Sequence, residues 1–153
     1  AKILIRINGL MAGVGSPVFS KLDAELAKAM MSVNAVKAVE VGAGTAVVSM
    51  RGSNNRDLMV KAGFLSNNSG GILGGISNGE EIDLYASLKP TSSISQKTTT
   101  VNQDNEEVDL QVKGRHDPCV GLRAAPILEA MAALCILDQV LLDKGQCFDV
   151  KRT

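Results

Sequence analysis

The sequence predicts an α+β fold in which helices pack against antiparallel β-sheet. Residues 81–89 and 107–113 alternate apolar and polar side chains, which is typical of half-buried strands. Two other segments repeat apolar side chains at helical spacing. Few crossover helices separate the predicted strands, and this favours antiparallel pairing. At 153 residues the chain has about the length of one domain and can bury a core. We therefore expect residues 1–153 to form a single domain.

The first third of the chain predicts a strand, a helix and two short strands. Residues 2–8 alternate, so their isoleucines share one face. Residues 13–33 predict a turn and then a helix, with Ser16 as N-cap and Pro17 at the first helical position. The apolar face of that helix comprises Val18, Leu22, Leu26, Met30 and Val33. Residues 36–42 and 45–50 predict strands on either side of a turn.

The rest of the chain predicts a turn-rich segment, two strands and a long helix. Residues 66–79 are rich in glycine and lack periodicity. Residues 90–106 are polar and predict a long loop or a hairpin connection between the two alternating strands. A helix is predicted over Arg123–Lys144, with Pro126 near its start and Gly145 just past its end. This helix is apolar on most of its circumference, so we expect other parts of the protein to cover it on several sides.

Charge and cysteine usage narrow the class of protein. The 16 basic and 16 acidic side chains balance, so neither a nucleic acid nor an anionic membrane is the expected partner. Residues 130–137 form the most apolar run, which is shorter than the ~20 residues of a membrane span. Cys119, Cys135 and Cys147 lack CxxC spacing and are odd in number, which favours reduced thiols in the cytoplasm over a disulfide framework or a metal site.

The first residues suggest that the chain is part of something larger. It starts directly with a strand pattern at Lys2, without an initiator methionine and without a signal peptide. We therefore expect this sequence to be a piece of a longer protein.

The single histidine lies in the segment GRHDPC. A triad of Cys119, His116 and Asp117 is disfavoured, because adjacent residues of an extended chain point to opposite faces. A turn fixed by Pro118 would instead aim Arg115, His116 or Asp117 at a common site. For this hexapeptide alone, a solvated charged turn with Cys119 packed as a small apolar side chain is the favoured interpretation.

The glycine segments do not predict a nucleotide fold. GAGTAV supplies Gly42 and Gly44 of a dinucleotide fingerprint, but Val47 stands where the third glycine belongs, and no GK[ST] follows a glycine run. In residues 66–79 the glycines either admit a ligand or let helix and strand pack closely.

The segment LKPTSSI is more suggestive of an anion site. Lys89 ends a predicted strand, Pro90 turns the chain, and the hydroxyls of Thr91, Ser92 and Ser93 follow. A lysine and neighbouring hydroxyls suit a phosphate, whereas the alternative is a polar hairpin turn with a solvated lysine.

Five segments, taken in order and spacing, resemble chorismate synthase over about Gly13 to Val150. They are residues 13–37, 51–57, 66–79, 89–94 and 114–134. The resemblance implies part of a fold in which helices lie between two antiparallel sheets, assembled as a homotetramer. It also implies a carbon–oxygen lyase of the shikimate pathway that needs reduced FMN, associated with NADP. The implied reaction is anti-1,4 elimination of phosphate from 5-enolpyruvylshikimate 3-phosphate to give chorismate.

The resemblance assigns roles to particular residues. Asp117 matches the aspartate that handles the proton on the flavin's ring nitrogen. The residues that match flavin contacts are Asn34, Ala35, Gly74, Lys89, Pro90, Thr91, Ser92, Ser93 and Arg115. His116 receives no role beyond that of a pocket wall or turn residue.

The chain departs from the family in length and in its histidines. The family enzyme is more than twice as long, and its N-terminal half carries two histidine acids and substrate-binding arginines that are absent here. We therefore expect a C-terminal part of the enzyme that is inactive by itself. The alternative is a non-catalytic structural or assembly module that keeps the fold and part of the flavin site.

Overall fold

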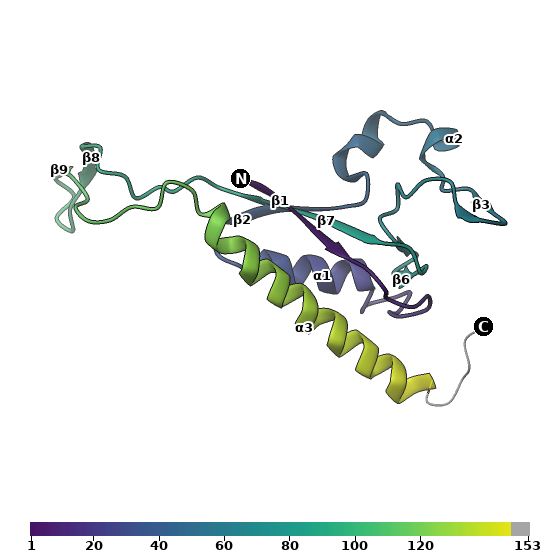
Figure 1. Cartoon of the computed structure of the whole chain (residues 1–153). Coiled ribbons are helices and arrows are strands. Elements are labelled where there is room, and N and C mark those ends of the chain that lie inside the picture. The colour runs from purple at the N-terminus through teal and green to yellow at the C-terminus, as the bar shows by residue number, and fades with distance from the viewer. Residues whose placement is uncertain (148–153) are drawn as a thin grey trace.

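The computed structural model describes residues 1–147, and at its centre is a three-stranded antiparallel sheet (Figure 1). The strands β1 (Lys2–Ile7), β7 (Ile82–Leu88) and β2 (Val36–Val41) lie in the order β1-β7-β2. Ile5 pairs with Leu84, and Val39 pairs with Ala86. The α+β class and the antiparallel pairing that the sequence predicts are confirmed.

The alternating pattern of β7 explains its central place. Ile82, Leu84, Ala86 and Leu88 are buried, whereas the side chains between them are half-buried on the other face. A strand with a neighbour on each edge can form backbone hydrogen bonds on both sides. Its apolar face can then pack into the core.

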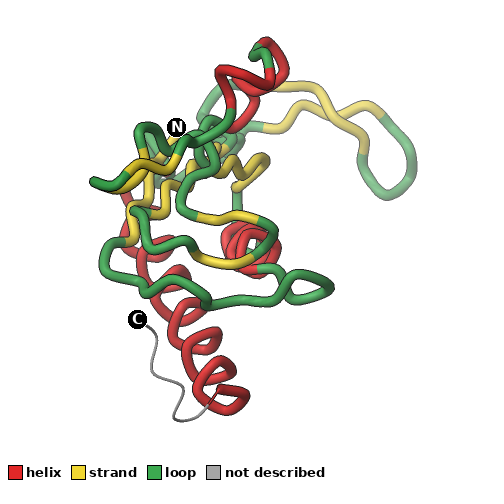
Figure 2. The backbone as a smooth tube through the Cα atoms, turned by 90° about the vertical axis from the view of Figure 1, so that its right-hand side faces the viewer, coloured by secondary structure: helices red, strands yellow, loops and turns green. Residues whose placement is uncertain are grey.

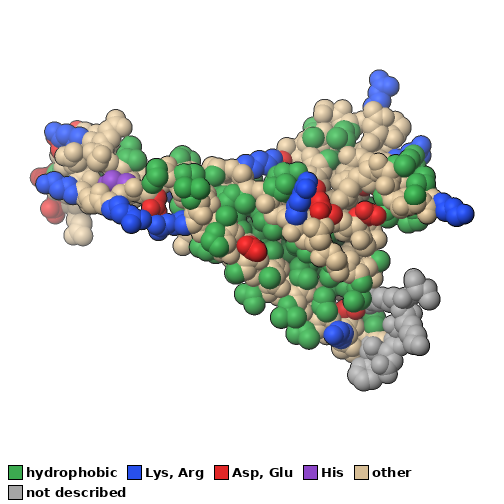
Figure 3. Space-filling view, viewed as in Figure 1, with side chains coloured by type: hydrophobic (Ala, Val, Ile, Leu, Met, Phe, Trp, Pro, Cys, Tyr) green, Lys and Arg blue, Asp and Glu red, His purple; other side chains and the backbone are tan. Residues whose placement is uncertain are grey.

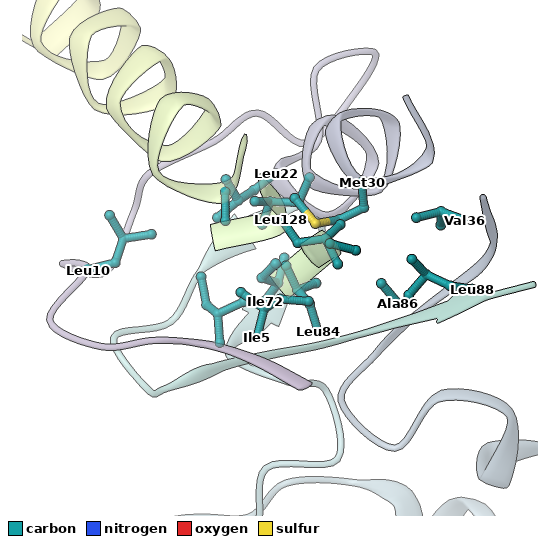
Figure 4. Close-up of a cluster of buried hydrophobic side chains, with 14 of the residues drawn as sticks. Ile5, Leu10, Leu22, Met30, Val36, Ile72, Leu84, Ala86, Leu88 and Leu128 are labelled. Atoms are coloured by element: carbon teal, nitrogen blue, oxygen red, sulfur yellow. The ribbon is translucent and has the colours of Figure 1, made fainter. Parts of the chain in front are cut away.

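Both long helices cover the same face of this sheet (Figures 1 and 2). Helix α1 (Leu22–Met31) buries Leu22, Leu26 and Met30 completely, as their four-residue spacing predicts. Helix α3 (Gly121–Cys147) packs on α1 and β1 and buries Leu128 (Figure 4). The core is therefore a layer between two helices and one sheet face.

Helix α1 begins later than the sequence predicts. Its first residue is Leu22 and its N-cap is Lys21, with no side-chain capping bond. Ser16 and Pro17 lie in an irregular segment before it. The Leu22 amide donates to the carbonyl of Gly75 at 2.8 Å, so a distant turn, rather than Ser16, satisfies a free amide of the first turn.

The predicted strand at residues 45–50 is wrong, because this segment forms a 3-10 helix, η1 (Gly44–Ser49). The Thr45 amide and hydroxyl both donate to Oε1 of Glu40, at 3.1 and 2.7 Å. Lys2 on β1 reaches across β7 to pair with the same carboxylate. The Lys2 ammonium and the Thr45 donors lower the pKa of Glu40 to about 2. These local bonds turn the chain where propensity alone favours a strand.

The remaining elements are short. They are α2 (Gly52–Asn55), and the hairpins of β3 (Met59–Val60) with β4 (Gly63–Phe64), β5 (Ile72–Leu73) with β6 (Ile76–Ser77), and β8 (Thr98–Val101) with β9 (Glu107–Leu110). The hairpin alternative for residues 90–106 is confirmed. However, β9 is exposed along its whole length rather than half-buried, because this hairpin extends away from the sheet (Figure 1).

Helix α3 is longer than predicted and contains both Pro126 and Gly145. Its outer side carries an exposed apolar stripe at alternating spacings of three and four, visible as green side chains along the helix in Figure 3. The stripe comprises Ile127, Ala130, Leu134, Leu137 and Leu141. By length and composition alone, α3 could span a membrane, a weak criterion that a core helix also meets. Cys135 on this helix, like the other two cysteines, is a free thiol, and burial raises its pKa.

The exposed stripe leads us to expect self-association of the isolated 153-residue chain, because uncovered apolar patches of this kind associate in water. Replacing Leu134 and Leu137 with Glu should shift sedimentation toward the monomer without a large change in Tm. Leu142→Glu is the matched control, since Leu142 is exposed on the same helix outside the stripe. A chain that is monomeric at all concentrations before mutation would contradict the expectation.

Candidate functional site

Three segments that are far apart in the sequence meet at the C-terminal end of β7. The Lys89 amide donates to the carbonyl of Ala35 at 2.9 Å, which joins the strand end to the loop after α1. The Thr91 hydroxyl donates to the backbone carbonyl of Asp117 at 3.0 Å. The hydroxyl-rich turn and the GRHDPC segment therefore lie side by side, as one shared site requires.

Two arginines hold the carboxylate of Asp117, whose side chain is only 23% exposed. Arg123 approaches it with two nitrogens: Nε lies 3.0 Å from Oδ2, and Nη2 lies 3.0 Å from Oδ1. Arg115 makes one longer contact, 3.4 Å from Nη2 to Oδ1. The site residues predicted from the sequence include Arg115 but not Arg123, which the structure shows to be the main partner of Asp117.

A signal for Arg123 does exist in the sequence. It lies in the first turn of the predicted α3, where a positive charge opposes the helix dipole and is disfavoured. An arginine at that position, six residues after an aspartate, suggests that it has an anionic partner.

Basic and hydroxyl side chains beside Asp117 are open to solvent. Lys89 is exposed, and within residues 1–147 no carboxylate forms a salt bridge with it. The Arg115 side chain is 83% exposed. Ser92 and Ser93 are exposed as well, and Ser92 lines a pocket of about 380 Å³ at the base of the β8–β9 hairpin. On the face drawn in Figure 3, basic side chains gather between this hairpin and the body of the protein. This cluster can receive an anion.

The loop at Asn34 and Ala35 borders the same strand end. Asn34 is exposed, and Ala35 has a φ of 74°, in the left-handed region that side chains other than glycine rarely adopt. Such strained backbone gathers at functional sites. The Ala35 conformation directs its carbonyl to the Lys89 amide, so the loop and the strand end are held together.

Gly74 does not lie in this cluster. It occupies the turn between β5 and β6, beside the start of α1, whereas Lys89 follows the far end of β7 (Figure 1). A seven-residue strand spans about 20 Å. Apart from Gly74 and its two chain neighbours, no atom of residues 1–147 lies within 4 Å of the position that a Cβ at Gly74 would take, and Gly74 is exposed.

His116 and Cys119 take no part in the hydrogen bonds that the structure shows around Asp117. Nε2 of His116 is enclosed and lacks a hydrogen-bond partner within residues 1–147, while Cys119 is exposed. The arginines, rather than His116, engage the Asp117 carboxylate. The disfavoured triad therefore receives no support.

Residues 1–141 match the family model described as chorismate synthase. The chain belongs to the chorismate synthase family. The match includes the first dozen residues, for which the sequence motifs show no clear resemblance. A solved structure titled "Crystal Structure of Chorismate Synthase" superposes with a TM-score of 0.73 at 26% sequence identity.

The alignment with that structure covers 94% of this chain and 38% of the other chain. The chain thus spans well under half the length of the chorismate synthase that it matches. Both the resemblance to the family and the fold class are confirmed.

Proposed function

We propose that this chain is the C-terminal part of a chorismate synthase and forms one side of its flavin and substrate site. The reaction is the anti-1,4 elimination of phosphate from 5-enolpyruvylshikimate 3-phosphate, giving chorismate, with reduced FMN as cofactor. One observation carries the proposal: the 3.0 Å bond from Thr91 to Asp117 unites the two family motifs at one exposed, basic position.

The residues at the end of β7 fit the phosphate group of FMN. Lys89 supplies a cation that forms no salt bridge within residues 1–147, Ser92 and Ser93 supply exposed hydroxyls, and Arg115 supplies an exposed guanidinium. Charge-assisted bonds to phosphate are about twice as strong as neutral ones. Pro90 fixes the turn between the lysine and the hydroxyls, while Asn34 and Ala35 border it from the neighbouring loop.

Asp117 is proposed to handle a proton at the ring nitrogen of the flavin. When bound, reduced FMN supplies an electron-rich ring system with a nitrogen that takes hydrogen from the substrate. The contacts with Arg115 and Arg123 hold the Asp117 carboxylate beside the basic cluster, which is where the proton acceptor is needed. The assignment of Gly74 as a flavin contact remains a prediction, since the other predicted contacts lie at the opposite end of β7.

The chain by itself is expected not to turn over substrate. His116 is its only histidine, so the two histidine acids that the family uses are not supplied by these residues. Adding the N-terminal part of the enzyme should produce chorismate. Persistent inactivity after that addition would favour the alternative, a structural or assembly module. A homotetramer, a cytoplasmic location and use of NADP are further proposals from family membership.

Lys89→Ala should raise the Kd for reduced FMN about tenfold in an anaerobic titration of the 153-residue chain. The substitution removes one charge-assisted contact, and tenfold corresponds to about 1.4 kcal/mol. Lys61→Ala is the matched control: it makes the same charge change at an exposed lysine in the distant β3–β4 turn.

Equal effects of the two lysine substitutions would mean that FMN responds only to net charge. If the unmodified chain changes neither the flavin spectrum nor its own Tm at high FMN concentration, the proposed flavin site fails for this chain.

A further inference from the structure

We infer that Arg123 is the residue that positions the carboxylate of Asp117, whereas Arg115 is left to bind the anionic ligand. The inference rests on the proposed function. It assigns different tasks to two arginines that contact the same carboxylate.

The two contacts differ in geometry. Arg123 meets the carboxylate with Nε and Nη2, each at 3.0 Å, so that both oxygens are held at once. Paired contacts of this kind fix the plane of a carboxylate as well as its place. Arg115 reaches only Oδ1, at 3.4 Å, and this single contact leaves the guanidinium free to rotate.

Separate interactions hold the main chain and the side chain of Asp117. Thr91 holds the backbone carbonyl, while Arg123 holds the carboxylate from the first turn of α3. The bond from the Ala124 amide to the Val120 carbonyl, 3.0 Å, continues the helical turn that carries Arg123. The orientation of Asp117 is therefore set from two directions, by the turn that follows β7 and by the start of α3.

This arrangement distinguishes the two carboxylate oxygens. Oδ1 accepts a hydrogen bond from each arginine, whereas Oδ2 lies 3.0 Å from Nε of Arg123 in an ion pair. Each carboxylate oxygen has two acceptor positions, so Oδ2 can still accept a hydrogen bond. Oδ2 is therefore the atom assigned to the proton at the flavin nitrogen.

The solvent exposure of the two arginines supports this assignment of different tasks to them. The side chain of Arg115 is 83% exposed, and that of Arg123 is 59% exposed. Arg115 can swing to an incoming phosphate and give up only its long contact. Arg123 would have to give up two contacts of 3.0 Å and would leave an unpaired positive charge at a helix N-terminus, where it is disfavoured.

The test compares Arg123→Gln, Arg123→Lys and Arg115→Gln in a full-length chorismate synthase that contains this segment. Arg123→Gln should lower kcat about tenfold and change the Kd for reduced FMN less than twofold. Arg123→Lys should recover part of kcat, because lysine restores the charge but not the two-point contact with the carboxylate. Arg115→Gln should raise the Kd for FMN about tenfold with a smaller effect on kcat.

A second readout does not depend on activity. NMR relaxation at Cγ of Asp117 in the 153-residue chain should report greater side-chain motion in Arg123→Gln than in Arg115→Gln. Unchanged motion in Arg123→Gln, or equal changes of kcat and Kd in both arginine variants, would overturn the inference. Failure of the unmodified enzyme to bind reduced FMN would instead overturn the proposed function.

Discussion

Gly42→Ala is expected to destabilise the folded chain by about 4 kcal/mol, the sum of a backbone cost and a steric clash. Gly42 has a φ of 56°, in the left-handed region. A Cβ there would lie 2.2 Å from the Asn68 carbonyl oxygen and 2.5 Å from the Gly70 nitrogen. Both are backbone atoms, which cannot rotate away as a flexible side chain can.

The contact at Gly42 joins three parts of the fold. Its amide donates to the Asp83 carbonyl at 2.9 Å, and the next amide, that of Ala43, donates to the Asn68 carbonyl at 2.8 Å. An alanine at Gly42 would separate the glycine-rich segment from the end of β2. We expect the loss to appear as a lower midpoint in urea unfolding.

Gly9→Ala is the matched control for Gly42→Ala. Gly9 also has a positive φ, 80°, but in the described part of the chain no atom beyond its own neighbours in sequence lies within 4 Å of the position of its added Cβ. It should therefore show only the backbone cost, about 1 kcal/mol. Equal losses in the two variants would show that the close approach at Gly42 is not what requires glycine.

Asp57→Asn is expected to raise amide exchange at Asn68 and Ser69 roughly 30-fold, equivalent to about 2 kcal/mol after allowance for the partial exposure of Asp57. The hydroxyls of Ser66 and Ser69 donate to its carboxylate at 2.6 and 2.7 Å. The amides of Asn68 and Ser69 donate at 2.8 Å. An asparagine presents an NH₂ group to this ring of donors and leaves some of them unpaired.

The same site makes stability depend on pH. Partial burial raises the pKa of Asp57, but the donors of Ser66, Ser69 and Asn68 outweigh it and hold that pKa well below its usual range. The folded-state pKa is therefore lower than the unfolded one. The stabilisation is fully present above pH ~4, the unfolded value, and is lost as the pH falls through the folded pKa.

Hydrogen exchange and acid unfolding check the Asp57 prediction together. Asp104→Asn is the control, because Asp104 is exposed at the tip of the β8–β9 hairpin. The wild type should lose protection at Asn68 and Ser69 on acidification, whereas Asp57→Asn should show a weaker pH dependence. An identical pH dependence in both proteins would show that another carboxyl group controls the segment.

Periodicity predicts the elements whose stability comes from one buried face. The alternation of residues 82–88 and the four-residue spacing of Leu22, Leu26 and Met30 are visible in the sequence, and both segments take the predicted form. The mistakes lie where a distant or polar contact determines the backbone. Glu40 converts the predicted strand at 45–50 into η1, and Gly75 replaces Ser16 at the start of α1.

Residues 66–79, the glycine-rich segment, show a similar limit to what the sequence predicts. The sequence leaves open whether its glycines admit a ligand or allow close packing. The structure supports close packing for Gly70 and Gly71, whose added Cβ atoms would meet the backbone of Gly42 and of Glu81, within 2.4 and 2.6 Å. Gly74 has no such neighbour among residues 1–147, so close packing there does not explain why this position is a glycine.

The sequence by itself determined the family, the α+β class and the identity of the segments around Lys89 and Asp117, because these depend on residue type and spacing. Only the tertiary structure decided that the two segments touch, that Arg123 holds Asp117, and that Gly74 lies at the other end of β7. Contacts across 26 residues, as between Thr91 and Asp117, depend on how strands and helices pack. No local pattern encodes that geometry.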